Sequence, residues 1–419
     1  MTAYEGWKEV WRPWYPLVEG IFYFCQGFYS IGSLLYVAVF AIDTFKLTVN
    51  TVALLQVAVV APVYLKIIPL AFCDRYPLGK YGRRRPYIAI AAIVYAISYA
   101  VLSQITTFDI LWIATVMIGM LAWVIADGCL DGLTIDVTPP EKAGLMQGVA
   151  WGGRGLGYAF GALVIGVMSS TINWSIIVLV IGVFAVIQCL AGILIKEPKV
   201  TTERVASLDA YKKVAKRRET WIGLAYILLA STALLVSEVF GITYLKEQTQ
   251  ADTTTLGIAL AIMSLGIFLG SIPMGIISDK VGTKKALLTG NVLAVIGCGL
   301  LATIGPSNLT WMLSIAFMAG VFQGTQMTAM LRMYMELSPP EIGGSMFALY
   351  SSMSNAGISV LASLTFYFAA PKLGNASGVL SVIPYVAVAT LMIPFMTLYK
   401  PEKKTPHTPR DKKCAMERS

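Results

Sequence analysis

Long apolar stretches constrain the fold of this chain more than any other feature of its sequence. Hydrophobic residues make up 57% of the 419 residues and charged residues 13%, against roughly 45–50% and 25% in soluble domains. No water-soluble fold of this length hides so much apolar side chain. Twelve stretches are long enough for a helix to cross about 30 Å of hydrocarbon. We therefore expect an all-α integral membrane protein with twelve transmembrane helices, near 17–41, 49–72, 87–104, 110–133, 144–168, 173–195, 221–244, 254–277, 286–303, 309–334, 344–370 and 376–399.

The placement of the basic residues predicts how these spans are oriented. Twelve spans put both chain ends on one side of the membrane, and 26 of the 32 Lys and Arg residues fall on that side. Three lie on the opposite side and three lie inside spans. Because cytoplasmic loops retain an excess of Lys and Arg, both termini are predicted to be cytoplasmic, in the cell membrane. The net charge of +9 therefore reports topology and does not indicate nucleic-acid binding.

The polar segments divide the chain into five parts. We expect an interfacial amphipathic helix at 1–16, where Trp and Tyr recur at helical spacing. Two six-helix bundles are expected at 17–195 and 220–400, joined by a cytoplasmic linker at 196–219, and the polar tail at 401–419 is expected to be disordered. The six cysteines lack metal-ligand spacing and the one histidine lies in the tail, so we expect no metal and no cofactor.

A short basic loop occurs at the same place in both apolar halves. Its copies cover 74–87 and 279–285, and their glycines, Gly82 and Gly282, are 200 positions apart. This repeat predicts two parallel halves with a site near the membrane midplane between them. We expect the loops to gate that site, through Asp74, Arg75, Gly82, Arg83, Arg84, Arg85, Asp279, Lys280, Gly282 and Lys284.

A second repeat precedes spans five and eleven. Thr138 and Ser338 are each followed by two prolines and then by a glutamate, Glu141 or Glu341. The spacing is that of a capping box, in which hydroxyl and glutamate bond the first backbone N–H groups of a helix. We expect Thr138 and Ser338 to cap the two spans.

Four charged residues lie at similar depth within the spans of the first half. They are Lys66, Asp127, Asp131 and Arg154, and charges inside hydrocarbon require a partner or a water-lined cavity. One interpretation is a neutral, structural salt-bridge cluster. The other is that a carboxylate exchanges its basic partner for a proton or a solute during transport. Asp127 is the better candidate, because its depth best matches that of Arg154.

The second half carries fewer such charges. Glu238, in the outer third of span seven, has no basic neighbour in sequence and is a second candidate proton site. Arg332 has Glu336 one turn later, and we expect the two to pair. Polar residues predicted along a central cavity are Gln26, Tyr29, Gln323, Gln326 and Asn355.

Span five contains glycines at four-residue spacing, which allow another helix to approach closely. They are Gly148, Gly152, Gly153, Gly157 and Gly161. Two interpretations are compatible: static tight packing, or a smooth ridge on which the two halves slide.

These motifs together resemble those of the major facilitator superfamily of transporters. One set of motifs looks like the muropeptide-permease and acetyl-coenzyme A transporter branch: Lys66, 74–76, 82–85 and the acids of span four. A second set looks like the folate–biopterin transporter branch: Pro77-Leu78, 84–87 and the pattern of Gly, Gln, Trp and Arg in 144–157. The resemblance to these branches covers 64–157, and the second half matches the superfamily pattern alone. It implies proton-coupled alternating access by two pseudo-symmetric six-helix bundles.

We therefore expect a secondary transporter for a small organic solute, polar or anionic, with the proton as coupling ion. A transporter-like sensor or assembly factor is the alternative. An enzyme is not expected, because the spans contain no histidine and no metal-ligand cluster. The expected partners are the solute, the proton and membrane lipids, with no nucleic acid, and the protein is expected to be monomeric.

Overall fold

The computed structural model describes residues 7–35, 44–47, 59, 61–78, 82–198, 206–234, 253–303, 309–365, 368 and 379–398. Every regular element within these residues is a helix. Each of the twelve predicted spans contains a helix in the described part of the chain, although several are described only in part. Five described helices are long and apolar enough to cross a membrane: 85–102, 110–137, 174–194, 258–281 and 283–301. Twelve complete crossings therefore remain a prediction.

The described helices fall into two groups, one from each half of the chain. The first contains α2 (Tyr15–Leu35), α5 (Ile67–Arg75), α6 (Arg85–Leu102), α7 (Ile110–Val137), α8 (Ala143–Thr171) and α9 (Trp174–Leu194). The second contains α11 (Arg218–Ala230), α14 (Thr253–Val281), α15 (Thr283–Leu301), α16 (Leu309–Leu337), α17 (Gly343–Ala356) and α20 (Ile383–Met392). The short helix α10 (Leu208–Ala215) lies in the linker.

The helix expected at 1–16 ends at Val10 in the described part of the chain. Helix α1 covers only Trp7–Val10, and α2 already begins at Tyr15. Pro13 lies between them, and it disfavours helix both at its own position and at the residue before it. Residues 1–6 lie outside the described part of the chain.

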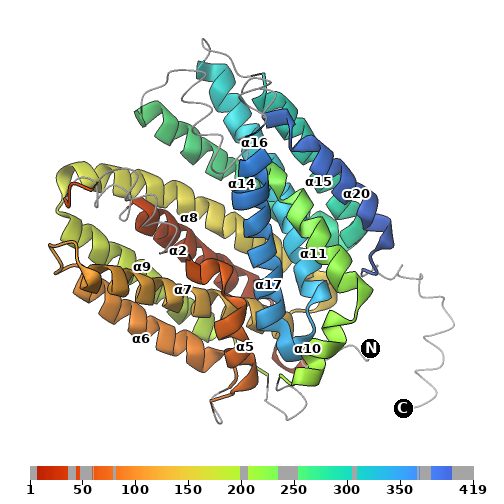
Figure 1. Cartoon of the computed structure of the whole chain (residues 1–419), viewed down its shortest axis with the longest axis horizontal. Helices are drawn as coiled ribbons and strands as arrows, with labels where there is room; N and C mark the ends of the chain where they lie inside the picture. Colours follow the sequence, from red (N-terminus) through yellow and green to blue (C-terminus); the bar gives the residue numbers. More distant parts are fainter. Residues whose placement is uncertain are drawn as a thin grey trace, which may run out of the picture.

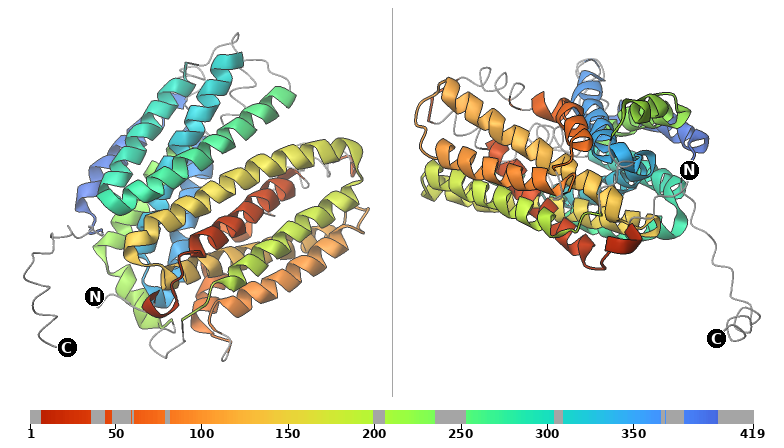
Figure 2. Two further views of the ribbon diagram at one scale, coloured as in Figure 1. Left: turned by 180° about the vertical axis from the view of Figure 1, so that it is seen from behind. Right: turned by 90° about the horizontal axis from the view of Figure 1, so that it is seen from below.

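The two halves converge at one end of the molecule and separate toward the other, as Figures 1 and 2 show. The converging end carries the loop at 82–85, Gly282 and the turns that precede α8 and α17, and we refer to it as the basic end. Contacts between the halves run mainly from α8 to α14 and from α17 to α5 and α7. The two contact sets are equivalent under the sequence repeat, since α8 and α17 are its spans five and eleven.

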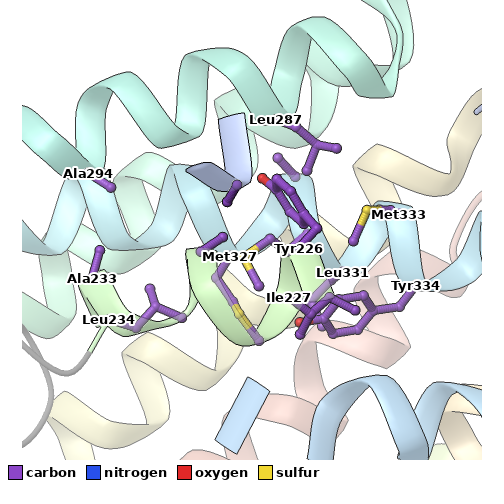
Figure 3. Close-up of a cluster of buried hydrophobic side chains, with 14 of the residues drawn as sticks. Tyr226, Ile227, Ala233, Leu234, Leu287, Ala294, Met327, Leu331, Met333 and Tyr334 are labelled. Carbon is purple, nitrogen blue, oxygen red and sulfur yellow. The ribbon is translucent and has the colours of Figure 1, made fainter. Parts of the chain in front are cut away.

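Each half has an apolar core of its own, in addition to the contacts between halves. In the second half, Tyr226 of α11 packs near Leu287 of α15 and near Met327 and Tyr334 of α16 (Figure 3). All four side chains are buried. The rigid core keeps α11, α15 and α16 together, so the half can move as one body.

Glycines bring α8 into close contact with both of its neighbours. A Cβ atom built on Gly153 would lie 2.4 Å from the carbonyl oxygen of Gly20 on α2. One built on Gly275 of α14 would lie 2.4 Å from the carbonyl oxygen of Gly144 on α8. Helix α8 is therefore packed backbone to backbone on α2 within its own half and on α14 across the boundary.

Candidate functional site

A cavity lies between the two halves, with an empty volume of about 700 Å³. Helices α2, α7 and α8 and the residues around the start of α5 line it from the first half, and α16 and α17 line it from the second. Its polar and aromatic lining consists of Tyr23, Lys66, Trp123, Asp127, Asp131, Trp151, Arg154, Tyr158, Phe347, Ser351, Ser354 and Asn355. The four charged residues that the sequence places at one depth thus all line one cavity.

Lys66 contacts both halves of the protein. Its Nζ lies 3.4 Å from Oδ2 of Asp127 on α7 and donates a 2.8 Å hydrogen bond to Oγ of Ser351 on α17. The Lys66 side chain is only 3% exposed, which strengthens its attraction to the carboxylate. A movement that separates α17 from α7 must therefore break one of these two bonds.

The two aspartates are also held by neutral side chains of α2. Gln26 donates a 2.5 Å hydrogen bond from Nε2 to Oδ1 of Asp127. Tyr23 donates its hydroxyl hydrogen to Oδ1 of Asp131. Asp127 is thus shared between a cation and an amide. The sequence left open whether Lys66 or Arg154 is its basic partner, and the structure pairs it with Lys66.

Arg154 lies against aromatic rings of its own helix. Its guanidinium carbon is 5.1 Å from the ring centre of Trp151 and 5.5 Å from that of Tyr158. Its Nε donates a 3.2 Å hydrogen bond to the Tyr158 hydroxyl. The rings flank Arg154 at one helical turn on either side, a spacing from which the sequence could have indicated them. They hold its planar cation at the cavity wall.

The polar residues predicted along the cavity separate into three groups. Asn355 lines it. Gln323 and Gln326 line a second, smaller space of about 250 Å³ between α11, α15 and α16. Gln26 and Tyr29 were predicted to line the central cavity and are not among its lining residues: Gln26 is buried against Asp127, and Tyr29 packs 5.3 Å from the ring of Tyr95. The direction in which a side chain of α2 points depends on the neighbouring helices, which the sequence does not show. Glu238 lies outside the described residues.

Arg83 and Arg84 close the basic end of the molecule. Arg84 bonds Asp74 with Nη2 at 3.0 Å and Asp136 with Nη1 at 2.5 Å, and Arg83 bonds Asp136 at 3.1 Å. Both arginines also donate to the carbonyl oxygen of Pro340 in the second half, at 2.9 and 3.3 Å. All these charged side chains are buried. The first basic loop is therefore attached directly to the turn that precedes α17.

The acid at the start of each basic loop caps a helix of the opposite half. Asp74 accepts hydrogen bonds from the backbone N–H of Ser345, at 2.8 Å, and from its hydroxyl, at 2.9 Å. Asp279 accepts from the backbone N–H groups of Gly144 and Leu145, both at 2.8 Å. Carboxylates are stabilised at helix N-termini by unpaired N–H groups and the helix dipole. These crossed caps hold the halves together at the basic end.

The predicted caps by Thr138 and Ser338 are wrong. Both side-chain hydroxyl oxygens are buried without a hydrogen-bond partner in the described part of the chain. The prolines instead start a short 3-10 turn in each half, at Pro140–Lys142 and Pro340–Ile342. The α-helices begin only after these turns, so the hydroxyls lie too far upstream to reach their first N–H groups.

The remaining loop residues contact groups within their own half or the linker. Arg332 pairs with Glu336 at 3.1 Å, which confirms the predicted pair, and it also contacts Asp279. Arg85 donates to the carbonyl oxygen of Ile193, Arg75 to that of Ala206 and Lys284 to that of Pro394. Lys280 is exposed. Gly82 and Gly282 have φ of +119° and +86°, a backbone region in which only glycine is unstrained.

The linker also contacts the closed basic end. Tyr211 of α10 shares a 2.8 Å hydrogen bond with the hydroxyl of Ser345, the residue whose N–H is capped by Asp74. Burial raises the pKa of the Tyr211 hydroxyl above its ordinary value, so it stays a neutral donor or acceptor. The linker is thus part of the contact between halves.

Comparison with known proteins gives matches along nearly the whole chain. A profile described as the BT1 family matches 26–220, and one described as the Major Facilitator Superfamily matches 224–415. The putative metabolite transport protein YwtG of Bacillus subtilis is 27% identical over 161 residues, 38% of this chain and 34% of that protein. The niacin transporter NiaP of Acinetobacter baylyi is 26% identical over 153 residues, 36% and 34% of the two chains. The chain thus spans about a third of the length of each of these relatives.

Solved structures show a similar fold over almost the whole chain. The transporter FucP in the outward conformation superposes with a TM-score of 0.71 at 14% identity, over 92% of this chain and 99% of its own. A bacterial homologue of the iron transporter ferroportin, in an outward-facing state, gives 0.69 at 12% identity, over 91% and 98%. At these identities the likeness concerns the fold alone, and it confirms the predicted all-α architecture.

Proposed function

The chain belongs to the major facilitator superfamily of membrane solute transporters, and on that premise we propose that it moves a small organic solute by proton-coupled alternating access. The observation that carries the proposal is the cavity in which Lys66, Asp127, Asp131 and Arg154 meet. A transporter with alternating access needs a solute site between its two halves, and here charged groups lie between halves that are joined at one end. The chain is a transporter and not an enzyme.

The lining of the cavity supports an organic anion as the solute. Arg154 presents a planar cation that can bond a carboxylate with two parallel hydrogen bonds. Trp123, Trp151 and Tyr158 provide apolar and aromatic surface on the same side. Two flat, anionic molecules fit this chemistry and are tested first: niacin, which the name of the relative NiaP gives as its solute, and the folates, which the resemblance of residues 64–157 suggests.

The proton and the solute act on the same ion pair in this mechanism. When Asp127 is protonated, it loses its attraction to Lys66, and the Lys66 cation is free to pair with an incoming anion. The loss of the bond between Lys66 and Ser351 then permits α17 to move away from α5 and α7. Because the two states differ in the contacts of one carboxylate, binding at the cavity shifts the equilibrium between them.

The closed basic end represents one extreme of this cycle. We infer that it faces the cytoplasm, from the placement of the Lys and Arg residues. The structure then corresponds to the state open to the outside, in which crossed caps and the arginine bonds to Pro340 are formed. Inward opening requires all of them to break together.

Uptake into proteoliposomes tests this function. Purified protein is first screened by thermal shift against nicotinate, folates, pterins, nucleotides, sugars and muropeptides, because a ligand of the native state raises its Tm. Radiolabelled hits are then offered to proteoliposomes with and without an inwardly directed proton gradient. We expect accumulation above the equilibrium level with the gradient alone. Binding without any uptake would instead support the sensor or assembly-factor alternative.

A further inference from the structure

Helices α2 and α7 are connected by three consecutive hydrogen bonds that lead out of the cavity. The bonded pairs are Gln26 with Asp127, Tyr23 with Asp131, and Glu19 with Thr134. On each helix the three positions follow one face, at intervals of three and four residues. The first two pairs serve the cavity aspartates, and the third lies one turn nearer the basic end.

Glu19 is the residue of this set for which the mechanism gives no role. Its side chain is completely buried. Oε2 accepts a 2.9 Å hydrogen bond from the Thr134 hydroxyl, and Oε1 has no hydrogen-bond partner within the described residues. No basic side chain of the described residues forms an ion pair with it.

Such surroundings suit a neutral carboxyl group and not a carboxylate. An unpaired charge buried in a protein within hydrocarbon is costly, and a group in that position takes up a proton instead. The buried carboxylates at the basic end, in contrast, have basic partners: Asp74, Asp136 and Asp279 all contact arginine. The sequence did not single out Glu19, because it lies so close to the start of its span.

Glu19 also lies between the cavity and the basic end. On one side, Asp131 lines the cavity. On the other, Thr134 is two residues before Asp136, which Arg83 and Arg84 hold in the closed basic end. A proton that leaves the cavity aspartates toward the basic end therefore meets Glu19 on its way.

We propose that Glu19 is a proton-binding residue that passes protons between the cavity aspartates and the cytoplasm. This rests on the proposed proton-coupled function. While the basic end is closed, Glu19 holds its proton. When that end opens, water reaches the carboxyl group, and the proton leaves Glu19 for the water. The carboxylate so formed then accepts the proton that Asp127 took up, passed on through Asp131, and Asp127 is again the carboxylate that pairs with Lys66.

Infrared spectroscopy of the full-length protein in liposomes tests the first part without any solute. At neutral pH the wild type should show the C=O stretching band of a buried protonated carboxyl group. Glu19→Gln should abolish it, whereas Glu9→Gln, a change at an exposed glutamate, should leave it intact. Thr134→Val removes the hydrogen bond to Oε2 and should move the band to higher frequency. A band insensitive to both Glu19→Gln and Thr134→Val would overturn the assignment.

The second part requires the basic end to be opened. The double variant Asp74→Asn, Asp279→Asn weakens both crossed caps, and spin labels on cysteines at positions 76 and 285, in a background without the native cysteines, report the separation of the halves. In the opened protein the Glu19 band should disappear at neutral pH. If the labels separate and the band stays, Glu19 is only structural and the proposal fails. If the Glu19 band disappears on opening but the wild type shows no proton-driven uptake, Glu19 is a proton site and the proposed proton coupling of transport is rejected.

Discussion

At the scale of single residues, the cavity combines groups that were predictable with groups that were not. Lys66, Asp127, Asp131 and Arg154 were identifiable, because depth along a helix follows from counting residues from a loop. Which partner each one has depends on the rotation and lateral position of its helix. The sequence therefore left open whether Lys66 or Arg154 is the neighbour of Asp127, and the structure pairs Asp127 with Lys66.

The pair of Lys66 and Asp127 distinguishes a proton carrier from a structural ion pair. Asp127→Asn mimics the protonated acid, so it should abolish proton-driven accumulation and leave solute exchange across the membrane measurable. If the pair is only structural, the variant strands a buried cation and should lose up to several kcal/mol of stability. The exchanged variant Lys66→Asp, Asp127→Lys provides the control. Full coupling in that protein would contradict proton carriage by Asp127.

The aromatic rings around Arg154 should contribute to solute binding. Trp151→Leu keeps an apolar side chain but removes the ring that orients the guanidinium, a contact of about 0.5–1 kcal/mol at a partly exposed position. Solute affinity should therefore fall about two- to fivefold in a binding titration, with no change in the dependence of uptake on the proton gradient. Arg154→Lys keeps the charge and should weaken binding more, because the planar donor pair is lost. Equal affinities for all three proteins would show that the solute does not contact Arg154.

At the scale of helices, the ends of the elements are held by residues far away in sequence. The carboxylate of Glu197, just after α9, accepts the backbone N–H groups of Arg83, Arg84 and Arg85 at the start of α6, at 2.9–3.2 Å. Local capping motifs predicted none of these contacts, because a capping box concerns only residues within one turn. The hydrophobic pattern predicted where helices exist, and tertiary contacts determined how they end.

Loss of the Glu197 cap should therefore destabilise the protein measurably. Glu197→Ala leaves three N–H groups at the start of α6 without their acceptor, and capping losses of this kind cost about 0.5–2 kcal/mol. We expect the Tm to fall in Glu197→Ala. The Tm of Glu197→Gln should fall less, because glutamine retains an acceptor oxygen. Glu141→Ala serves as the matched control, because Glu141 is exposed. An equal loss of Tm in Glu141→Ala would restore the capping-box interpretation.

At the scale of the whole molecule, the predicted architecture rests on two features of the sequence. Neither depends on where individual helices begin and end. The apolar runs depend only on local composition, and the offset of 200 between Gly82 and Gly282 depends only on the repeat. Both indicated paired six-helix halves. The state of the cycle could not be predicted, because one sequence specifies every state and only the contacts of Asp74, Asp279, Arg83 and Arg84 show which end is closed.

The orientation of the molecule in the membrane is a direct prediction of its charge distribution. Lys212 in the linker has a side chain that is 72% exposed. A single cysteine at this position, in a background without native cysteines, should resist an impermeant maleimide applied to intact cells and react after the cells are permeabilised. The same reagent should reach a cysteine in place of Lys372, between spans eleven and twelve, from outside. Labelling at 212 in intact cells would reverse the topology.

The glycine contact between α8 and α14 should favour the closed basic end. Gly148→Val places a branched side chain where a Cβ atom already lies 2.7 Å from the carbonyl oxygen of Ser271. The two helices must then separate, so spin labels across the basic end should move apart and uptake should slow. Gly166→Val is the control, because a Cβ atom at Gly166 meets nothing within 4 Å. Unchanged label distances in Gly148→Val would mean that this contact does not hold the halves.

The crossed caps have a consequence for how such a protein can change in evolution. Asp279 binds the peptide N–H groups of Gly144 and Leu145, and every residue except proline supplies such a group. Asp74 binds one peptide N–H, that of Ser345, and also the Ser345 hydroxyl and Arg84. A mutation at Leu145 to any residue but proline therefore needs no compensating mutation in Asp279. Gly144 and Ser345 are less free, because a Cβ atom at Gly144 would lie 2.4 Å from the carbonyl oxygen of Gly275 and the Ser345 hydroxyl itself bonds Asp74. Asp279 should be retained while position 145 varies, so substitutions at these two positions should be only weakly correlated, although the two residues bind the halves to each other directly.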